Sequence, residues 1–122
     1  MIEKTFAEKF ARDWIGAWNS HDIGRILSHY ADDFEMHSPA ILQVTGEPSG
    51  MLKGKAAVGD YWQNALQLVP DLEFELLGTF SGINTIALYY KGAWSRMVIE
   101  ILHFRADRKV SKAYAHYAEL ES

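Results

Sequence analysis

The first stretch of the chain repeats its apolar residues with the period of an α-helix. Large apolar side chains recur at every fourth position from Ile2 onward, and charged residues occupy the opposite face. This pattern predicts one amphipathic helix from Ile2 to about Trp18. Asn19 and Ser20 are typical of the C-terminal end of a helix, and either Ser20 or Asp22 is suited to cap a second helix. The apolar residues of that second helix are Ile23, Ile26, Leu27 and Tyr30.

The middle of the chain is interrupted by proline and glycine. Residues 34–38 predict a short strand that Pro39 ends, and the glycine- and proline-bearing stretch up to Lys53 predicts an irregular loop. Helical spacing then returns from Lys55 to Val69, and Pro70 closes it. We therefore expect a third helix there.

After Pro70 the period of the pattern changes from that of a helix to two. Apolar positions 72, 74 and 76 alternate with acidic ones, which is typical of a strand with one face exposed to water. Further strands are predicted at 85–91, 94–105 and 109–119, with short turns at Gly82, Gly92 and Asp107. Because the connections are short, these strands favour an antiparallel meander. Helices followed by a curved antiparallel sheet predict an α+β fold.

Length, composition and charge narrow the class of protein. The 122 residues are 48% hydrophobic and 13% aromatic, which suits one folded domain over residues 1–122. Sixteen acidic against twelve basic residues give a net charge of -4, which argues against nucleic acid as a partner. The chain has no cysteine, no leader-like segment and no long apolar run, so we expect a cytoplasmic protein that does not enter membranes. Its five histidines are scattered, and we expect no metal and no cofactor.

Glu100 is the most unusual residue of the sequence, because it is the one carboxylate inside an otherwise apolar strand. Burial would disfavour its charge and make it a candidate general acid or base. The alternative is a structural ion pair with Arg96 on the same strand face. The aromatic stripe of the first helix is in the first instance core, although the indoles of Trp14 and Trp18 would also suit the wall of a pocket.

The order and spacing of several segments resemble the nuclear transport factor 2-like superfamily, and within it the SnoaL-like polyketide cyclases and the ketosteroid isomerases. The segments are Trp14 to Asp22, Tyr30-Ala31-Asp32-Asp33, His37-Ser38-Pro39, Gly46-x-Pro48-Ser49-Gly50 with Gly54, Tyr61-Trp62, Ile101-x-His103-Phe104-Arg105, Lys109-Val110 and Ala115-x-Tyr117-x-Glu119. The resemblance implies a cystatin-like cone: a curved antiparallel sheet around a long helix, with an apolar pocket inside. It also implies a homodimer that packs through the outer face of the sheet.

The catalytic residues of the ketosteroid isomerases are not present at the matching positions. Ser38 stands where those enzymes have the aspartate general base, Trp14 stands for their oxyanion tyrosine, and Leu102 stands for their protonated aspartate. Steroid isomerisation by that mechanism is therefore excluded. Tyr30 and Trp62 match the places of two tyrosines behind the oxyanion group. The acidic residue that SnoaL-type cyclases keep in the sheet is also missing, since the last strand has Ala113 and Ala115 there.

The resemblance also predicts which side chains face the pocket. If Leu102 points inward, strand alternation turns Glu100 inward as well, and it sends His116 of the last strand outward. A Glu100–His116 dyad would then require a β-bulge. The expected pocket has Glu100 and Tyr30 as catalytic candidates. Its ligand-binding candidates are Trp14, Trp18, Ser38, Trp62, Leu102 and Tyr117.

Three functions remain open on this evidence. The first is a cofactor-free isomerase, cyclase or dehydratase in which Glu100 transfers protons, with Trp14 or Tyr30 donating to the oxyanion of a small apolar or aromatic substrate. The second is a module that binds such a ligand without turnover, and the third is a structural dimer with a vestigial pocket.

Overall fold

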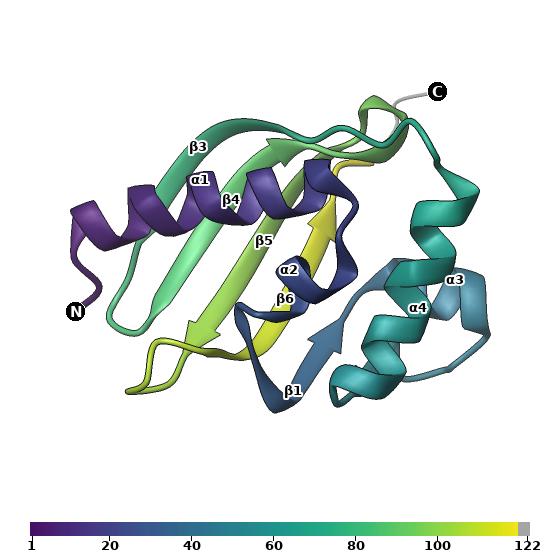
Figure 1. The fold of residues 1–122 in the computed structure, drawn as a ribbon, viewed down its shortest axis with the longest axis horizontal. Coiled ribbons are helices and arrows are strands. Elements are labelled where there is room, and N and C mark those ends of the chain that lie inside the picture. Colours follow the sequence, from purple (N-terminus) through teal and green to yellow (C-terminus); the bar gives the residue numbers. More distant parts are fainter. Residues whose placement is uncertain (120–122) are drawn as a thin grey trace.

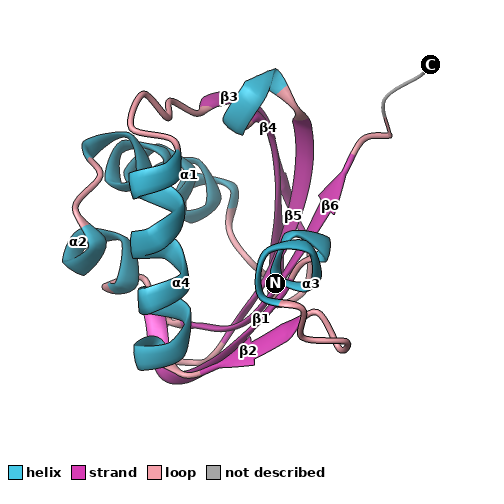
Figure 2. Ribbon diagram, turned by 90° about the vertical axis from the view of Figure 1, so that its right-hand side faces the viewer, coloured by secondary structure: helices cyan, strands magenta, loops and turns pink. Residues whose placement is uncertain are grey.

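The structure, a computed structural model, describes residues 1–119 and places helices against one face of a curved sheet (Figure 1). The helices are α1 (Lys4–Ser20), α2 (Ile23–Leu27), α3 (Pro39–Thr45), α4 (Lys55–Leu68) and the short 3-10 helix η1 (Ala93–Ser95). The strands are β1 (Tyr30–His37), β2 (Met51–Lys53), β3 (Glu75–Ser81), β4 (Thr85–Lys91), β5 (Met97–Phe104) and β6 (Val110–Tyr117). Seen from the side, α1, α2 and α4 form a layer on one face of the sheet (Figure 2). The predicted α+β class is confirmed.

Within residues 1–119 the sheet has six strands in the order β2-β1-β6-β5-β4-β3. The predicted antiparallel meander is confirmed for β3, β4, β5 and β6, which pair with their neighbours in sequence. The two remaining pairs differ. β1 pairs antiparallel with β2 but parallel with β6, so the sheet is not antiparallel throughout.

The first helix forms as its apolar period predicts, displaced by two residues toward the C-terminus. Its buried side chains are Ala7, Phe10, Ala11, Trp14, Ala17 and Trp18. His21 adopts a left-handed conformation (φ 59°) and donates its backbone N–H to the carbonyl of Trp18, which ends the helix. Asp22 then caps α2 by accepting a hydrogen bond from the backbone N–H of Arg25 at 3.1 Å.

Three element predictions were wrong in position or type. Tyr30 begins β1 instead of ending the second helix, because its spacing from Ile26 fits both a helix and the inner face of a strand. The stretch 39–53, expected as a loop, contains α3 and β2; α3 starts on Pro39 with Ser38 as its cap. β3 begins at Glu75 and not at Leu72, because the Asn19 amide holds the Phe74 backbone through two hydrogen bonds of 3.0 and 2.7 Å.

The alternation expected for β5 is confirmed. Val98, Glu100, Leu102 and Phe104 are all buried on the face that meets the helices. Glu100 lies opposite Ala115 of β6, and His116 lies opposite Ile99 on the outer face. The regular β5–β6 register between Val98 and His103 excludes a Glu100–His116 dyad.

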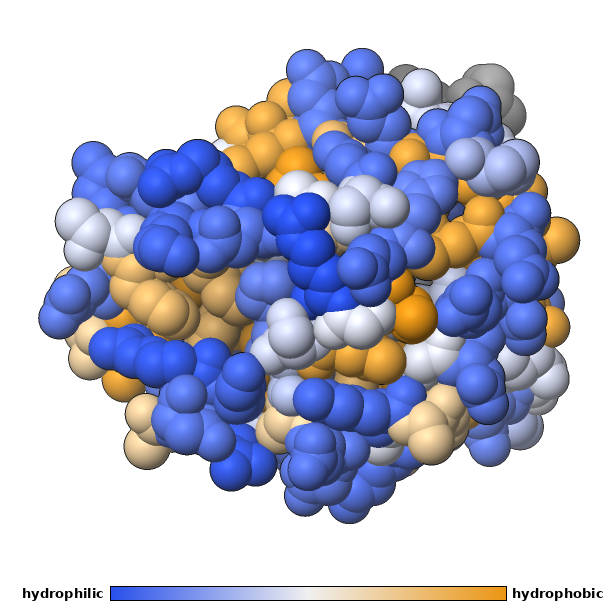
Figure 3. Space-filling view, in the orientation of Figure 1, coloured by the Kyte–Doolittle hydropathy of each residue, from blue (hydrophilic) through white to orange (hydrophobic). Residues whose placement is uncertain are grey.

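The helices turn their polar sides outward. The face that α1 and α4 present is mostly hydrophilic, with apolar patches between the polar side chains (Figure 3). Their apolar sides and the inner face of the sheet form one core cluster, which includes Trp14, Tyr30, Phe34, Trp62 and Leu102. This core occupies one part of the space between the two layers, and a cavity occupies another.

Candidate functional site

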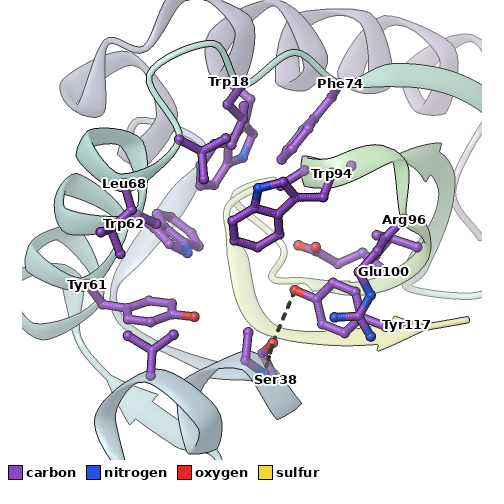
Figure 4. A pocket seen from close by; sticks show the side chains of 18 of the residues that line it. Trp18, Ser38, Tyr61, Trp62, Leu68, Phe74, Trp94, Arg96, Glu100 and Tyr117 are labelled. Carbon is purple, nitrogen blue, oxygen red and sulfur yellow. Dashed lines mark hydrogen bonds between the residues drawn. The ribbon is translucent and has the colours of Figure 1, made fainter. Parts of the chain in front are cut away.

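A cavity of about 190 Å³ opens between the inner face of the sheet, α3, α4 and the loop that carries η1 (Figure 4). The strands contribute Met36, Tyr90, Val98, Glu100 and Tyr117, and α4 contributes Tyr61, Trp62, Ala65 and Leu68. Most of the lining is apolar or aromatic. Ligand pockets for drug-sized molecules usually measure roughly 300–1,000 Å³, so this cavity suits a compact ligand.

Glu100 lies in the wall of this cavity, and its side chain is almost fully enclosed. The residue is 3% exposed, and it is the one carboxylic acid among the described lining residues. Its Oε1 accepts a hydrogen bond of 2.9 Å from the hydroxyl of Tyr90 on the neighbouring strand. Burial raises the pKa of Glu100 to about 7, although the Tyr90 hydrogen bond acts in the opposite direction. Near neutral pH the carboxyl group therefore exchanges readily between its two protonation states.

Tyr90 stays protonated over the same pH range. It is fully buried, and burial followed by the charge of Glu100 raises its pKa well above 10. Its hydroxyl therefore remains a hydrogen-bond donor whether Glu100 is charged or neutral. The Tyr90–Glu100 pair thus fixes the orientation of the carboxyl group in the cavity wall.

Ser38 and Tyr117 form a second polar part of the wall. The Ser38 hydroxyl accepts a hydrogen bond from the backbone of Ala40 at 3.1 Å and donates a long one, 3.4 Å, to the hydroxyl of Tyr117. Gly50 pairs with the backbone of Ser38 at 2.9 Å and has a φ of 65°; a Cβ there would lie 3.2 Å from the Ser38 carbonyl oxygen. Glycine at position 50 therefore lets the chain hold Ser38 in place.

The α4 side of the cavity carries aromatic rings and one further hydroxyl. Trp18 packs edge-on against Trp62 with 5.0 Å between ring centroids, and Tyr61 projects into the cavity (Figure 4). Burial, with a smaller contribution from Tyr117, raises the pKa of Tyr61 to about 12. The indole N–H of Trp18 is buried and has no hydrogen-bond acceptor among the described residues. This wall therefore offers the Tyr61 hydroxyl as a donor to a ligand oxygen.

Arg96 and Trp94 occupy the side of the cavity next to η1. The guanidinium of Arg96 lies over the ring of Tyr117, 4.5 Å from its centroid. Trp94 is 78% exposed and lines the cavity at its mouth, and it adopts a left-handed backbone (φ 54°) that is uncommon for a bulky residue. Within residues 1–119, Arg96 makes no ion pair with Glu100, so the structural pair considered from the sequence is not formed.

Five of the eight site residues named from the sequence line the cavity: Trp18, Ser38, Trp62, Glu100 and Tyr117. The other three lie in the core behind it. The indole of Trp14 donates a hydrogen bond of 2.8 Å to the hydroxyl of Tyr30, and both residues are fully buried. Leu102 is also fully buried. Trp14, Tyr30 and Leu102 are therefore not part of the cavity lining, and they support the wall from behind.

The sequence interpretation did not include Tyr61, Tyr90 or Arg96 among the site residues. Tyr90 could have been predicted from the sequence. The turn at Gly92 sets the register of β4 against β5, and because Glu100 points inward, this register makes Tyr90 point inward as well. Tyr61 precedes Trp62 on a helix whose orientation was not known. Arg96 was considered only as a partner of Glu100.

Nowhere in residues 1–119 do three or more His, Asp or Glu side chains gather as they would around a metal ion. None of the helices described here has the length and apolarity needed to cross a bilayer.

A curved sheet with helices on one face and a largely apolar cavity between the two layers defines the class as a pocket-bearing protein of the cystatin-like, nuclear transport factor 2-like fold. Residues 11–113 match the model of the SnoaL-like domain. Because this match spans most of the 122 residues, the chain belongs to the SnoaL-like family. The resemblance noted in the sequence is thereby confirmed. Among curated proteins, none matches the chain.

Solved structures share the fold over nearly the whole chain. A SnoaL-like protein of unknown function from Burkholderia thailandensis is 54% identical, with a TM-score of 0.95 and coverage of 97% of this chain and 98% of that one. A candidate isomerase of the SnoaL-like family from Agrobacterium tumefaciens is 14% identical, with a TM-score of 0.75 and coverage of 94% and 99%. AclR from Streptomyces galilaeus, a candidate hydroxylase, is 16% identical, with a TM-score of 0.71 and coverage of 95% and 91%. The last two likenesses concern the fold alone.

Proposed function

We propose that this protein binds a small apolar or aromatic molecule in the cavity and that Glu100 transfers protons on it, in a cofactor-free isomerisation, cyclisation or dehydration. The observation that carries the proposal is a single carboxyl group, 3% exposed, in the wall of an aromatic cavity. Its pKa of about 7 is suited to general acid–base catalysis at neutral pH, because the base form is populated and still basic enough to accept a proton.

The chemistry that these groups support is proton transfer beside a carbonyl. In an isomerisation, the Glu100 carboxylate removes a proton from the carbon between a carbonyl and a C=C bond, and the electron pair moves onto the carbonyl oxygen to give a dienolate. The carbonyl then re-forms, the double bond shifts into conjugation with it, and the protonated carboxyl returns the proton to the far carbon of the original C=C bond. The hydroxyl of Tyr61 points into the cavity and replaces Trp14 and Tyr30 as the donor to the developing oxyanion.

Hydrogen–deuterium exchange tests this proposal without knowledge of the natural product. The probe is 2-indanone, a compact aromatic ketone, incubated with the protein in D₂O and followed by proton NMR. We expect the protein to accelerate exchange of the protons beside the carbonyl, and Glu100→Gln to lose roughly 100-fold or more of that rate. His116→Gln, a change on the outer face of β6, is the matched control. Equal rates for wild type and Glu100→Gln would overturn a catalytic role of Glu100.

A second candidate function is ligand binding without turnover. It is favoured by Ala113 and Ala115 on β6 and by Ser38 before Pro39, since each occupies a place where related enzymes carry an acidic residue. Under this alternative, 2-indanone binds wild type and Glu100→Gln with similar affinity, and neither protein accelerates exchange. Isothermal titration beside the exchange assay separates the two functions.

We also propose that two copies of the chain pair through the outer face of the sheet. The support is apolar exposure on that face: Phe80 of β3 is 61% exposed and Ile99 of β5 is 46% exposed. Leu77, at an irregularity in β3, is exposed nearby. Exposed apolar patches of this kind mark interaction surfaces.

A further inference from the structure

Arg96 is the one positively charged residue among the described residues that line the cavity. A guanidinium keeps its charge at all physiological pH values. Within residues 1–119 no carboxylate oxygen lies within ion-pair distance of it, and its Nε–H is buried without an acceptor. A cation in a cavity wall without a carboxylate partner points to a ligand that supplies the negative charge.

The ring of Tyr117 holds the guanidinium in place. Arg96 lies over this ring at 4.5 Å, and Figure 4 shows the two side chains together on the same side of the cavity. Tyr117 is fixed in turn by the hydroxyl of Ser38. Stacking on an aromatic face leaves the edge of the guanidinium available, and that edge is the part that matches a carboxylate with two parallel hydrogen bonds.

The charge balance of the cavity favours an anion. Glu100 is the one acid in the described lining, and its burial disfavours the charged form. At pH 6, below the pKa of about 7, most of Glu100 is neutral and Arg96 gives the cavity a net positive charge. An anionic group on the ligand compensates this charge in surroundings where the low dielectric strengthens the attraction.

We propose that the ligand of this cavity is a small aromatic or apolar carboxylic acid, and that Arg96 binds its carboxylate while the aromatic wall holds the remainder. The inference rests on the proposed function, in that it assumes a ligand in the cavity, and it adds the chemical class. The carboxylate belongs on the η1 side next to Tyr117. The compact apolar part belongs between Trp18, Trp62 and Phe74, where Figure 4 shows the aromatic rings facing the cavity.

Phenylacetate and phenylacetamide are suitable probes, because they have the same size and shape and differ in charge. Affinity is measured by isothermal titration at pH 6 for wild type, Arg96→Gln and Arg96→Lys. We expect wild type to prefer phenylacetate by at least tenfold and Arg96→Gln to lose that preference while its affinity for phenylacetamide changes less than threefold. Arg96→Lys should retain part of the preference. Arg105→Gln, an exposed arginine after the end of β5, is the matched control, and circular dichroism verifies that each variant is folded.

The outcomes separate this inference from the proposed function. Equal binding of the two probes by wild type, or an unchanged preference in Arg96→Gln, overturns the carboxylate assignment and leaves the ligand pocket standing. Binding of neither probe at millimolar concentration overturns the carboxylate assignment, and a failure of 2-indanone to bind as well overturns the pocket itself.

Discussion

The hydroxyl of Tyr90 donates a hydrogen bond to Oε1 of Glu100 at 2.9 Å, across the β4–β5 pair and inside the cavity wall. The two residues are diagonal neighbours on one face of the sheet, since Tyr90 lies opposite Val98 and Leu88 lies opposite Glu100. Burial raises the pKa of the carboxyl group, and this hydrogen bond lowers it. The balance between these two effects sets the pH at which Glu100 changes from acid to base.

Removing the Tyr90 hydroxyl should shift that balance. Tyr90→Phe deletes a hydrogen bond to the charged form of Glu100, so the pKa of Glu100 should rise further above about 7. The pH profile of 2-indanone exchange should move to higher pH in this variant. Tyr89→Phe, a change on the opposite face of the same strand, serves as control. An unchanged profile in Tyr90→Phe would show that Glu100 is not the titrating group.

The raised pKa also makes stability depend on pH. The pKa of Glu100 is about 7 in the folded chain against 4.5 for the free group, so folding favours the protonated form. The free energy of unfolding should therefore fall as the pH rises from about 4 to about 7, by on the order of 3 kcal/mol in total. Glu100→Gln should remove this dependence and be the more stable protein above pH 7. Urea unfolding at pH 5 and pH 8 measures both effects.

The control for this prediction is Glu73→Gln, which changes an exposed carboxylate. It should retain the pH dependence of wild type. If Glu100→Gln and wild type lose stability in parallel between pH 5 and pH 8, the carboxyl group of Glu100 does not titrate in this range.

The Trp14–Tyr30 hydrogen bond should contribute to stability and little to catalysis. Tyr30→Phe leaves the buried indole N–H of Trp14 without its acceptor, at a cost of about 1–3 kcal/mol. The rate of 2-indanone exchange should stay within a few-fold of wild type, because Tyr30 does not line the cavity. A loss comparable to that of Glu100→Gln, in a folded variant, would place Tyr30 among the reacting groups after all.

Trp94 should lower the stability of the protein through its strained backbone and strengthen ligand binding through its indole. The residue has a φ of 54°, which costs a bulky side chain roughly 1–2 kcal/mol relative to glycine. Trp94→Gly should therefore melt at the same temperature as wild type or higher, while phenylacetate binds several-fold more weakly. Trp94→Ala removes the same indole but keeps the strain, so it should bind as weakly as the glycine variant and be less stable. A Trp94→Gly protein with unchanged affinity would exclude the indole from the binding site.

The outer face of the sheet should hold a dimer together. Ile99→Lys places a charge at the centre of the exposed apolar residues of β3 and β5, and it should convert a dimer into a monomer in sedimentation experiments. Ile83→Lys is the control, because Ile83 is also an exposed isoleucine but lies in the β3–β4 turn. A wild-type monomer at micromolar concentration would contradict the proposal.

The periodicity of apolar residues predicted an element correctly where the sequence fits only one period. The stripe from Phe6 to Trp18 predicted α1, whereas the buried face of β5 was predicted from the resemblance, in which the position of Leu102 faces the pocket. Tyr30 was assigned to the wrong element because a spacing of four from Ile26 suits a helix, and the preference of the sheet for its ring is a tertiary effect. The short α3 was missed, although Ser38 and Pro39 are typical of a helix start.

The candidate site was predictable only where strand alternation or the resemblance applied. Trp14 and Trp18 lie four residues apart on one helix face, yet one packs in the core and the other reaches the cavity. That difference depends on the position of α4 and Phe74, which no local pattern contains. The stacking of Arg96 on Tyr117 likewise joins residues that are distant in the sequence.

The position of β6 in the sheet determines when the sheet can be completed during synthesis on the ribosome. Among the described strands it is the last to be synthesised, yet it lies between β1 and β5 and joins the two halves of the sheet. Until residues 110–117 emerge, β1 has only β2 as a partner and the nascent chain has no continuous sheet. Such non-local pairing folds slowly. The binding cavity, which Tyr117 completes, is therefore among the last features to form.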